Sequence, residues 1–222
     1  QIFSLDADTL ILGGGTPRGV LYSVYEYLER NHGVIWLDEN DTFVKKSASI
    51  QWPNAWNISG QPSIANRSVY NIFMPKSWLW KIRHRQNFFH VQEKRFEDYG
   101  IAPLFGAPKS WHNFYLYTAD VKKEDEDIFS LVNGKRLRAL TGHGPGQICY
   151  SNPKTLAHFK KKLTEYIAQD RKGTPAEFYP VYYSISGNDN RQECECAGCK
   201  AIIRKYKSKA AAKLCFVNKL AK

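Results

Sequence analysis

Short apolar runs of strand length alternate along the chain with segments whose apolar residues recur at helical spacing. In the first such unit, residues 9–12 have the pattern of a buried strand, and Thr16 with Pro17 forms a typical helix start. Gly33 is placed to end that helix, and residues 34–37 resume a strand. Strands that alternate with helices of this length predict an α/β fold with a parallel sheet, and they exclude a coiled coil.

Three glycines lie between this first strand and its helix, where phosphate-binding loops occur. The run Gly13-Gly14-Gly15 is followed by no Lys-Ser/Thr pair, and Arg18 stands where the G-x-G-x-x-G pattern needs a third glycine. We therefore expect a tight strand-to-helix turn, which glycine tolerates best.

The alternation resumes beyond residues 47–66, a segment rich in Ser, Asn, Pro and Trp that we interpret as a linker. Further strands are expected at 68–74, 112–117, 147–150 and 178–185. Helices are expected at 78–89, at 124–132 before an Asn133-Gly134 turn, after the Asn152 cap, and from 201 to the end. The prediction is an α/β domain at 1–58 followed, at 62–222, by the first half of a (β/α)₈ barrel, which takes about 250 residues in full.

The chain of 222 residues is basic, with 32 Lys and Arg against 21 Asp and Glu and a formal charge of +11. A hydrophobic content of 43% is too high for a disordered chain. No run approaches the ~20 apolar residues of a membrane span, so none is expected. The late lysines indicate either the solvated face of helices or an anionic partner such as an acidic polysaccharide or a nucleic acid.

Three cysteines within six residues form the sharpest local cluster, Cys194-x-Cys196-x-x-Cys199. They would hold zinc if Cys149, Cys215 or a histidine supplied a fourth ligand. Two of them would instead form a disulfide in an exported protein, or all would stay reduced and structural. Five cysteines cannot all pair within one chain.

Polar residues that follow predicted strands are candidates for a site, because the carboxyl ends of barrel strands face the active site. Asn188 and Asp189 follow the strand 178–185, and Asn152 follows the strand 147–150. The structural alternatives are a helix cap for Asn152 and loop chemistry for residues 188–190. We take Asp189 as the candidate catalytic carboxylate, with candidate substrate-binding residues His112, Asn188, Asn152, Arg83 and Trp111.

Several longer motifs resemble known families. Residues 11–22, 25–28 and 33–37 resemble the end of the small α/β domain 2 that precedes the barrel of β-hexosaminidases and α-glucuronidases. The remainder resembles a bacterial family of glycoside-hydrolase-like barrels, domain of unknown function 4838. The motifs that carry this second resemblance are residues 112–114, 129–136, 147–153 and 184–189, the cysteine trio and residues 216–218. Compared with members of these two families, the chain is expected to lack the N-terminal part of the first domain and the C-terminal half of the barrel.

The resemblance implies a glycoside hydrolase that acts on a polysaccharide or oligosaccharide, including one that bears uronic acids. Such enzymes use two carboxyl groups, and the partner of Asp189 would lie outside this chain. The alternative is a carbohydrate-binding protein with a degenerate barrel and no catalysis. A nucleic-acid-binding module rests on the charge alone, so the expected partner is a carbohydrate and not a nucleic acid. No oligomeric state is favoured.

The expected location is secreted, periplasmic or at the cell surface. The chain begins with Gln1 and has no basic-then-apolar leader, which favours a processed form or a piece of a longer protein.

Overall fold

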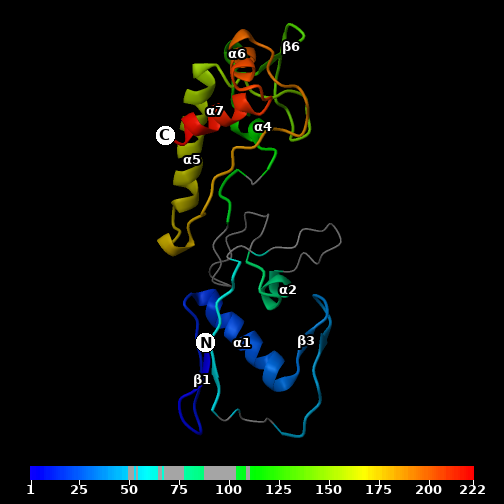
Figure 1. Ribbon diagram of the computed structural model, residues 1–222, viewed down its shortest axis with the longest axis vertical. Coiled ribbons are helices and arrows are strands. Elements are labelled where there is room, and N and C mark those ends of the chain that lie inside the picture. Colours follow the sequence, from blue (N-terminus) through cyan, green and yellow to red (C-terminus); the bar gives the residue numbers. More distant parts are fainter. Residues whose placement is uncertain (50–52, 54, 65–66, 68–77, 88–103, 109–110) are drawn as a thin grey trace. The chain divides into compact units, whose positions relative to one another are not determined.

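The structure is a computed structural model that describes residues 1–49, 53, 55–64, 67, 78–87, 104–108 and 111–222. The chain divides into two compact units, which we treat separately. Among the described residues, those up to 87 belong to the N-terminal unit and those from 104 onward belong to the C-terminal unit (Figure 1). Both units mix helices with strands, so the coarse α/β prediction is confirmed.

The N-terminal unit holds a small antiparallel sheet in the order β2 (Leu10–Leu12), β1 (Ile2–Ser4), β5 (Asn57–Ile58). Helix α1 (Pro17–His32) follows β2, and a two-stranded ribbon of β3 (Ile35–Trp36) and β4 (Thr42–Phe43) follows the helix. The predicted strand–turn–helix–strand unit is therefore present. Its two strands do not pair with each other: β2 pairs antiparallel with β1, and β3 pairs antiparallel with β4.

Helix α1 begins and ends at the residues that its sequence predicts. The hydroxyl of Thr16 accepts a hydrogen bond from the Gly19 amide at 3.0 Å, and Gly33 takes a left-handed φ of 62° at the C-cap. Gly14 has no room for a side chain, since a Cβ there would lie 2.2 Å from the carbonyl carbon of Gly19. The glycine run is thus a tight turn that brings the strand and the helix into contact.

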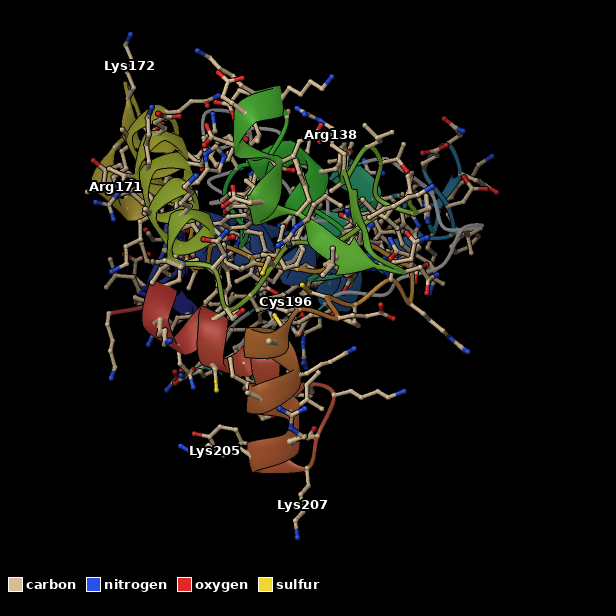
Figure 2. All side chains as sticks on the ribbon, turned by 90° about the horizontal axis from the view of Figure 1, so that it is seen from above. Arg138, Arg171, Lys172, Cys196, Lys205 and Lys207 are labelled. Atoms are coloured by element: carbon tan, nitrogen blue, oxygen red, sulfur yellow. The ribbon has the colours of Figure 1, made fainter. Side chains whose placement is uncertain are left out.

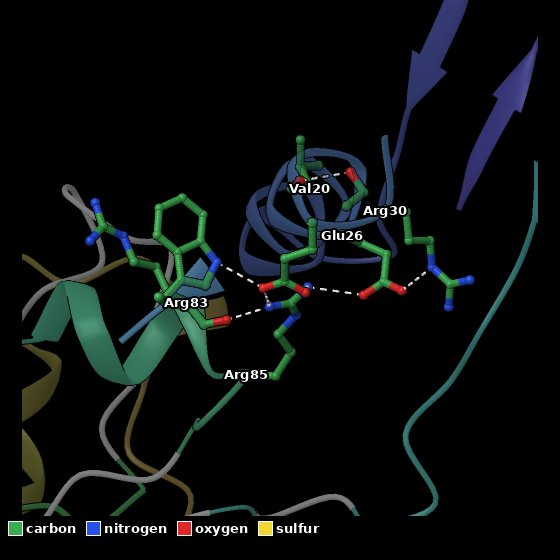
Figure 3. Close-up of polar contacts among 8 residues, drawn as sticks. Val20, Glu26, Arg30, Arg83 and Arg85 are labelled. Carbon is green, nitrogen blue, oxygen red and sulfur yellow. Dashed lines mark hydrogen bonds and ion pairs between the residues drawn. The ribbon is translucent and has the colours of Figure 1, made fainter. Parts of the chain in front are cut away.

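Helix α2 (Trp78–Arg83) is shorter than the predicted 78–89 helix, and the difference has a visible cause. Arg85 adopts a left-handed φ of 57°, which ends the helix and directs its guanidinium toward α1. There it binds Glu29 at 2.6 and 2.8 Å and Glu26 at 2.9 Å, while Trp36 donates its indole N–H to Glu29 at 2.8 Å (Figure 3). This network fixes α2 against α1.

The C-terminal unit begins with a short helix and a hairpin. Helix α4 (Phe114–Tyr117) and a 3₁₀ helix (Lys123–Ile128) precede the antiparallel pair β6 (Ser130–Val132) and β7 (Lys135–Leu137). Helix α5 (Pro153–Arg171), a 3₁₀ turn (Ala176–Phe178), α6 (Ala197–Tyr206) and α7 (Ala211–Leu220) follow. Helix α7 packs against both α5 and α6.

The core of this unit is aromatic. Phe159 of α5 stacks on Tyr117 of α4 with ring centroids 4.8 Å apart, and it meets Phe114 and Phe216 edge-on. All four side chains are buried, and such aromatic pairs add to the hydrophobic stabilisation. Cys149 and Cys199 belong to the same buried cluster, so the cysteines lie at the edge of the core.

Two predicted strands are wrong. Residues 114–117 form helix α4, because Phe114 and Tyr117, three positions apart, both turn into the core, and this tertiary burial overrides the strand propensity of an aromatic run. The segment 178–185 begins at the end of a 3₁₀ turn and makes a single parallel bridge, from Tyr182 to Phe105. Pro180 lies in the middle of that segment and has no amide to donate, which disfavours a regular ladder.

Three further elements differ from their prediction. Residues 147–150 are extended with one antiparallel bridge, from Ile148 to Phe129. The expected helix at 124–132 is a 3₁₀ helix followed by strand β6, since Asn133-Gly134, with φ of 49° and 74°, makes a hairpin turn rather than a helix end. The expected C-terminal helix is two helices, because Lys207 takes a left-handed φ of 52°.

The strand expected at 68–74 and part of the linker lie outside the described residues. Among the described residues, no helix has the length and apolar character to cross a membrane. The named strands of the described part all pair antiparallel. The described residues show one isolated parallel bridge and do not confirm a parallel barrel, which stays a prediction.

Candidate metal centre

Four cysteines meet at the edge of the C-terminal core. The Sγ atoms of Cys149, Cys194, Cys196 and Cys199 all lie within 4.8 Å of one another, and the Sγ atoms of Cys149 and Cys196 are 3.6 Å apart. A tetrahedral site with metal–sulfur bonds of about 2.3 Å has sulfur–sulfur edges of about 3.8 Å. A disulfide needs about 2.05 Å, and all five cysteines are free. The spacing therefore fits a tetrahedral metal site.

The four thiols come from two segments that are far apart in the sequence. Cys149 follows the bridge residue Ile148, whose neighbours bond to residues 128 and 130. Cys194 and Cys196 lead into α6, and Cys199 lies in the first turn of that helix. Cys196 is the N-cap of α6, where the helix dipole favours a thiolate (Figure 2).

Amide and hydroxyl groups surround the sulfurs. The Cys199 amide donates to Cys196 Sγ at 3.4 Å, and the Leu131 amide donates to Cys194 Sγ at 3.4 Å. The Ser151 hydroxyl lies 3.3 Å from Cys196 Sγ and 3.7 Å from Cys149 Sγ, and it accepts from the Cys199 thiol at 3.4 Å. Hydrogen bonds of this kind orient metal ligands and stabilise their negative charge.

Gly198 makes the approach of Ser151 possible. A Cβ on Gly198 would lie 2.6 Å from the Ser151 Oγ, so a larger residue would displace the hydroxyl from the sulfurs. Without a metal, hydrogen bonds from the Cys194 and Cys199 thiols hold the pKa of Cys149 far below its usual value. Contacts with Cys149 and Cys194 raise the pKa of Cys199.

The cluster bears directly on the cysteine predictions. The trio 194, 196 and 199 is brought together as expected, and of the fourth ligands considered, the structure selects Cys149. Cys215 lies on α7 and is not a member of the cluster. Four thiols with no open position are the donor set of a structural site that binds a thiophilic metal.

The loop that carries Asp189 is held by a buried side chain that the sequence analysis did not single out. Gln147 Nε2 donates to the Asn188 carbonyl at 2.6 Å, and the Asn188 amide donates to Gln147 Oε1 at 3.0 Å. The same Nε2 also donates to Asn190 Oδ1 at 3.1 Å. Asn188 itself is buried and its side chain bonds to Gly146 and Tyr115, so its polar groups hold the loop together.

Asp189 differs from its neighbours because its side chain is 67% exposed. The Nδ1 atom of His143 lies 3.8 Å from its carboxylate. The ring of His143 is in turn 5.9 Å from that of His112, centroid to centroid. The structure thus groups Asp189 with the predicted His112 and with His143, which no sequence pattern indicated.

His112 is held in an unusual conformation. Its φ is 46°, its amide donates to the Ser186 hydroxyl at 3.2 Å, and its Nδ1 lies 3.2 Å from the Gly187 carbonyl. A carbonyl can only accept, so Nδ1 carries the proton in that contact, and in the neutral ring Nε2 is then an acceptor. A non-glycine residue with a left-handed φ is a common feature of functional sites.

The remaining predicted residues lie elsewhere or are already engaged. Asn152 caps α5 by accepting from the Lys154 amide at 2.9 Å, and its amide group donates to Asp127 at 3.0 Å. Arg83 belongs to the N-terminal unit and places its guanidinium 4.4 Å from the centroid of the Trp36 ring. Trp111 precedes His112 and is 37% exposed.

The C-terminal unit is thus a small α/β domain with a four-thiol cluster that could hold a metal. The chain belongs to the family described as domain of unknown function (DUF4838), whose model matches residues 36–222. Comparison with curated proteins found no match, and comparison with solved structures found none either.

Proposed function

We propose that this chain is part of a secreted or surface-exposed glycoside-hydrolase-like protein and that the loop at 186–190 presents Asp189 to a carbohydrate. One observation carries the proposal. Asp189 is 67% exposed and has His143 at 3.8 Å, while Asn188 and Asn190 on either side are locked to Gln147. A rigid loop that exposes one carboxylate beside a histidine is suited to bind and act on sugar hydroxyls.

The groups around Asp189 suit a sugar. In its neutral form, His112 offers Nε2 as a hydrogen-bond acceptor, and Trp111 beside it in the chain offers part of an aromatic face. Aromatic faces and hydrogen-bonding groups together match the apolar faces and the hydroxyls of a pyranose ring. A well-hydrated carboxylate in polar surroundings serves as nucleophile, base or hydroxyl acceptor rather than as proton donor.

The second carboxyl group of a hydrolase would come from a later part of the protein. Within the proposal, residues 62–222 form the first half of a (β/α)₈ barrel, and the N-terminal residues form the end of a hexosaminidase-type domain 2. The runner-up is a carbohydrate-binding protein without catalysis, which would use the same surface.

Zinc is the metal that we propose for the cluster. Cys149, Cys194, Cys196 and Cys199 would hold it, and a four-thiolate site of this kind is closed and structural. Zinc would supply cross-links between the segment that begins at Gln147 and the segment that follows Asn190. The first segment is hydrogen-bonded to the loop of Asp189 through Gln147, and the second continues from that loop, so the metal would stabilise the base of the carbohydrate site.

The test compares Asp189→Asn with Glu177→Gln in the zinc-loaded full-length protein. Both replace an exposed carboxylate of the C-terminal unit by its amide. The release of reducing ends and the retention in glycan-containing gels are measured over a panel of polysaccharides. We expect Asp189→Asn to abolish turnover at an unchanged melting temperature and Glu177→Gln to act like the parent.

Loss of glycan binding without any turnover in the parent protein would favour the non-catalytic alternative. Unaltered turnover and binding in Asp189→Asn would refute the assignment of Asp189. A large loss of stability would show that Asp189 only holds its loop.

A further inference from the structure

Helices α6 and α7 carry many cations and no acid. Residues 197–222 contain no Asp and no Glu. Their cations are Lys200, Arg204, Lys205, Lys207, Lys209, Lys213, Lys219 and Lys222. We call these eight residues the basic surface. All but Lys213 are exposed, and Figure 2 shows Lys205 and Lys207 projecting outward from the end of α6 opposite to Cys196.

On α5, by contrast, two lysines lie close to acidic side chains. Lys162 pairs with Asp120 at 3.1 Å and with Glu165 at 3.0 Å, and Lys154 lies 3.5 Å from Asp125 and from Asp127. Among the described residues, Lys213 is the one member of the basic surface with an ion pair, to Glu193 at 4.0 Å. The basic surface is therefore largely uncompensated, whereas α5 is mixed in sign.

This arrangement does not help the helices themselves. Lys200 and Arg204 are four positions apart on α6, and like charges at that spacing are mildly destabilising. Helix α6 is held to the protein by its apolar residues, since Ile202 and Ile203 pack on the core. A solvated face normally mixes both signs, so the excess of one sign points to an anionic partner.

Lys213 connects the basic surface to the loop of Asp189. A Cβ on Gly187 would lie 2.8 Å from Lys213 Nζ, so the ammonium sits against that glycine. Gly187 also receives the His112 contact and stands two residues before Asp189. One end of the basic surface is thus in contact with the loop that we assign to carbohydrate.

We propose that the basic surface binds an anionic polysaccharide, whose carboxylate or sulfate groups pair with the cations while the chain extends toward Asp189. This inference rests on the proposed function and adds the class of substrate. Tyr206 is 55% exposed with the Lys205 ammonium 5.3 Å from the centroid of its ring, which offers a sugar one aromatic face beside a cation. Single-stranded nucleic acid sites use several aromatic side chains to stack successive bases. Tyr206 is the one exposed aromatic residue of 197–222, which favours a polysaccharide over a nucleic acid as the partner.

The test uses two variants with the same loss of charge. Arg204→Gln/Lys205→Gln/Lys209→Gln removes three exposed cations of the basic surface. Lys160→Gln/Lys161→Gln/Lys172→Gln removes three exposed cations of α5 and its C-cap. The zinc-loaded full-length proteins are titrated with polygalacturonate, dextran sulfate, neutral dextran and a single-stranded oligonucleotide at about 50 and 200 mM salt.

We expect the parent to bind polygalacturonate or dextran sulfate but not neutral dextran, and we expect that binding to weaken at the higher salt concentration. The first variant should bind about tenfold more weakly or worse, and the second should bind like the parent. Preference for one polysaccharide identifies carboxylate or sulfate as the recognised group.

Equal weakening by both variants would overturn the proposal, because net charge alone would then explain binding. Tighter binding of the oligonucleotide than of both anionic polysaccharides would overturn it in favour of a nucleic-acid surface. Turnover of neutral glycans that depends on Asp189, without any anionic binding, would refute this inference and leave the proposed function intact.

Discussion

The side-chain amide of Gln147 pairs with the backbone of Asn188 as one strand pairs with another, donating to its carbonyl at 2.6 Å and accepting from its amide at 3.0 Å. Gln147 is 1% exposed, so both bonds are made out of contact with solvent. A single buried amide therefore supports a loop that has little regular structure of its own.

Replacing Gln147 by alanine should lower the free energy of unfolding by about 3 kcal/mol, because it leaves buried backbone groups unsatisfied. Urea denaturation measures the change. Gln169→Ala, the same substitution on the exposed side of α5, should change stability by less than about 0.5 kcal/mol. Equal effects of the two substitutions would show that the amide pairing is not what stabilises the loop.

The cysteine cluster predicts one zinc ion per chain. Cys149→Ser should weaken zinc binding by more than about a hundredfold, since it removes one of four ligands. Cys215→Ser is the matched control and should bind zinc like the parent, because Cys215 is outside the cluster. Competition with a chelator gives the affinities, and cobalt substitution gives the tetrahedral thiolate spectrum. A parent protein free of zinc that keeps four reactive thiols would contradict the prediction.

Ser151 should act as a positioning residue for the sulfurs. Ser151→Ala is expected to weaken zinc binding by about 10- to 100-fold, the usual cost of losing a hydrogen bond to metal ligands. Gly198→Ala should act in the same direction, because its methyl group would lie 2.6 Å from the Ser151 hydroxyl. Ser208→Ala, an exposed serine between α6 and α7, should leave the affinity unchanged. A shift of the cobalt absorption bands in Ser151→Ala would separate an effect on the ligands from a general loss of stability.

The Asp120–Lys162 pair predicts a dependence of stability on acid. Burial opposes ionisation of Asp120, but the hydrogen bond and the charge of Lys162 outweigh it and lower the pKa of that carboxyl group. The stabilisation is therefore present above the unfolded carboxyl pKa of about 3.9 and is lost as pH falls through the folded value. It should amount to less than about 1 kcal/mol, because Asp120 is 56% exposed.

Carboxyl-detected NMR titration of Lys162→Gln tests this directly. The pKa of Asp120 should rise in that variant, and the stability difference from the parent should vanish at low pH. The control Lys161→Gln should leave the Asp120 titration in place. An unchanged Asp120 pKa in Lys162→Gln would rule out the pairing.

In the N-terminal unit, Arg85→Ala should cost about 1–2 kcal/mol, because the guanidinium binds Glu29 through two nitrogens and also reaches Glu26. Arg85→Lys should recover little of this, since an ammonium cannot reproduce the planar two-nitrogen contact. Arg30→Ala removes a cation from the same Glu26 at an exposed site and should cost about 0.3–0.5 kcal/mol. Thermal unfolding of this unit measures all three.

Helix ends were predictable because their signals are local. Thr16, Gly33 and Asn152 each occupy the cap position that their residue type favours. Between these caps, apolar residues that recur at helical spacing predicted the helices themselves. The same locality explains why the trio Cys194, Cys196 and Cys199 was visible in the sequence.

Features that depend on distant partners were not predictable. Residues 114–117 look like a strand in isolation and become a helix because Phe114 and Tyr117 both reach the core. Gln147 and His143 carry no motif, and their roles appear only when the loop at 186–190 lies beside them. Cys149 was one of several possible fourth ligands until folding placed it 3.6 Å from Cys196.

The cysteine cluster also sets an order of events in biosynthesis. Cys149 and Cys196 are 47 positions apart, and the whole of α5 lies between them. A chain emerging from the ribosome therefore exposes Cys149 well before its three partners are made. Under the proposed export through an oxidising compartment, that solitary thiol would be open to capture by a wrong cysteine. Under that proposal, correct maturation would depend on keeping Cys149 reduced until α6 has been completed, and the yield of native protein would follow the redox state along the export route.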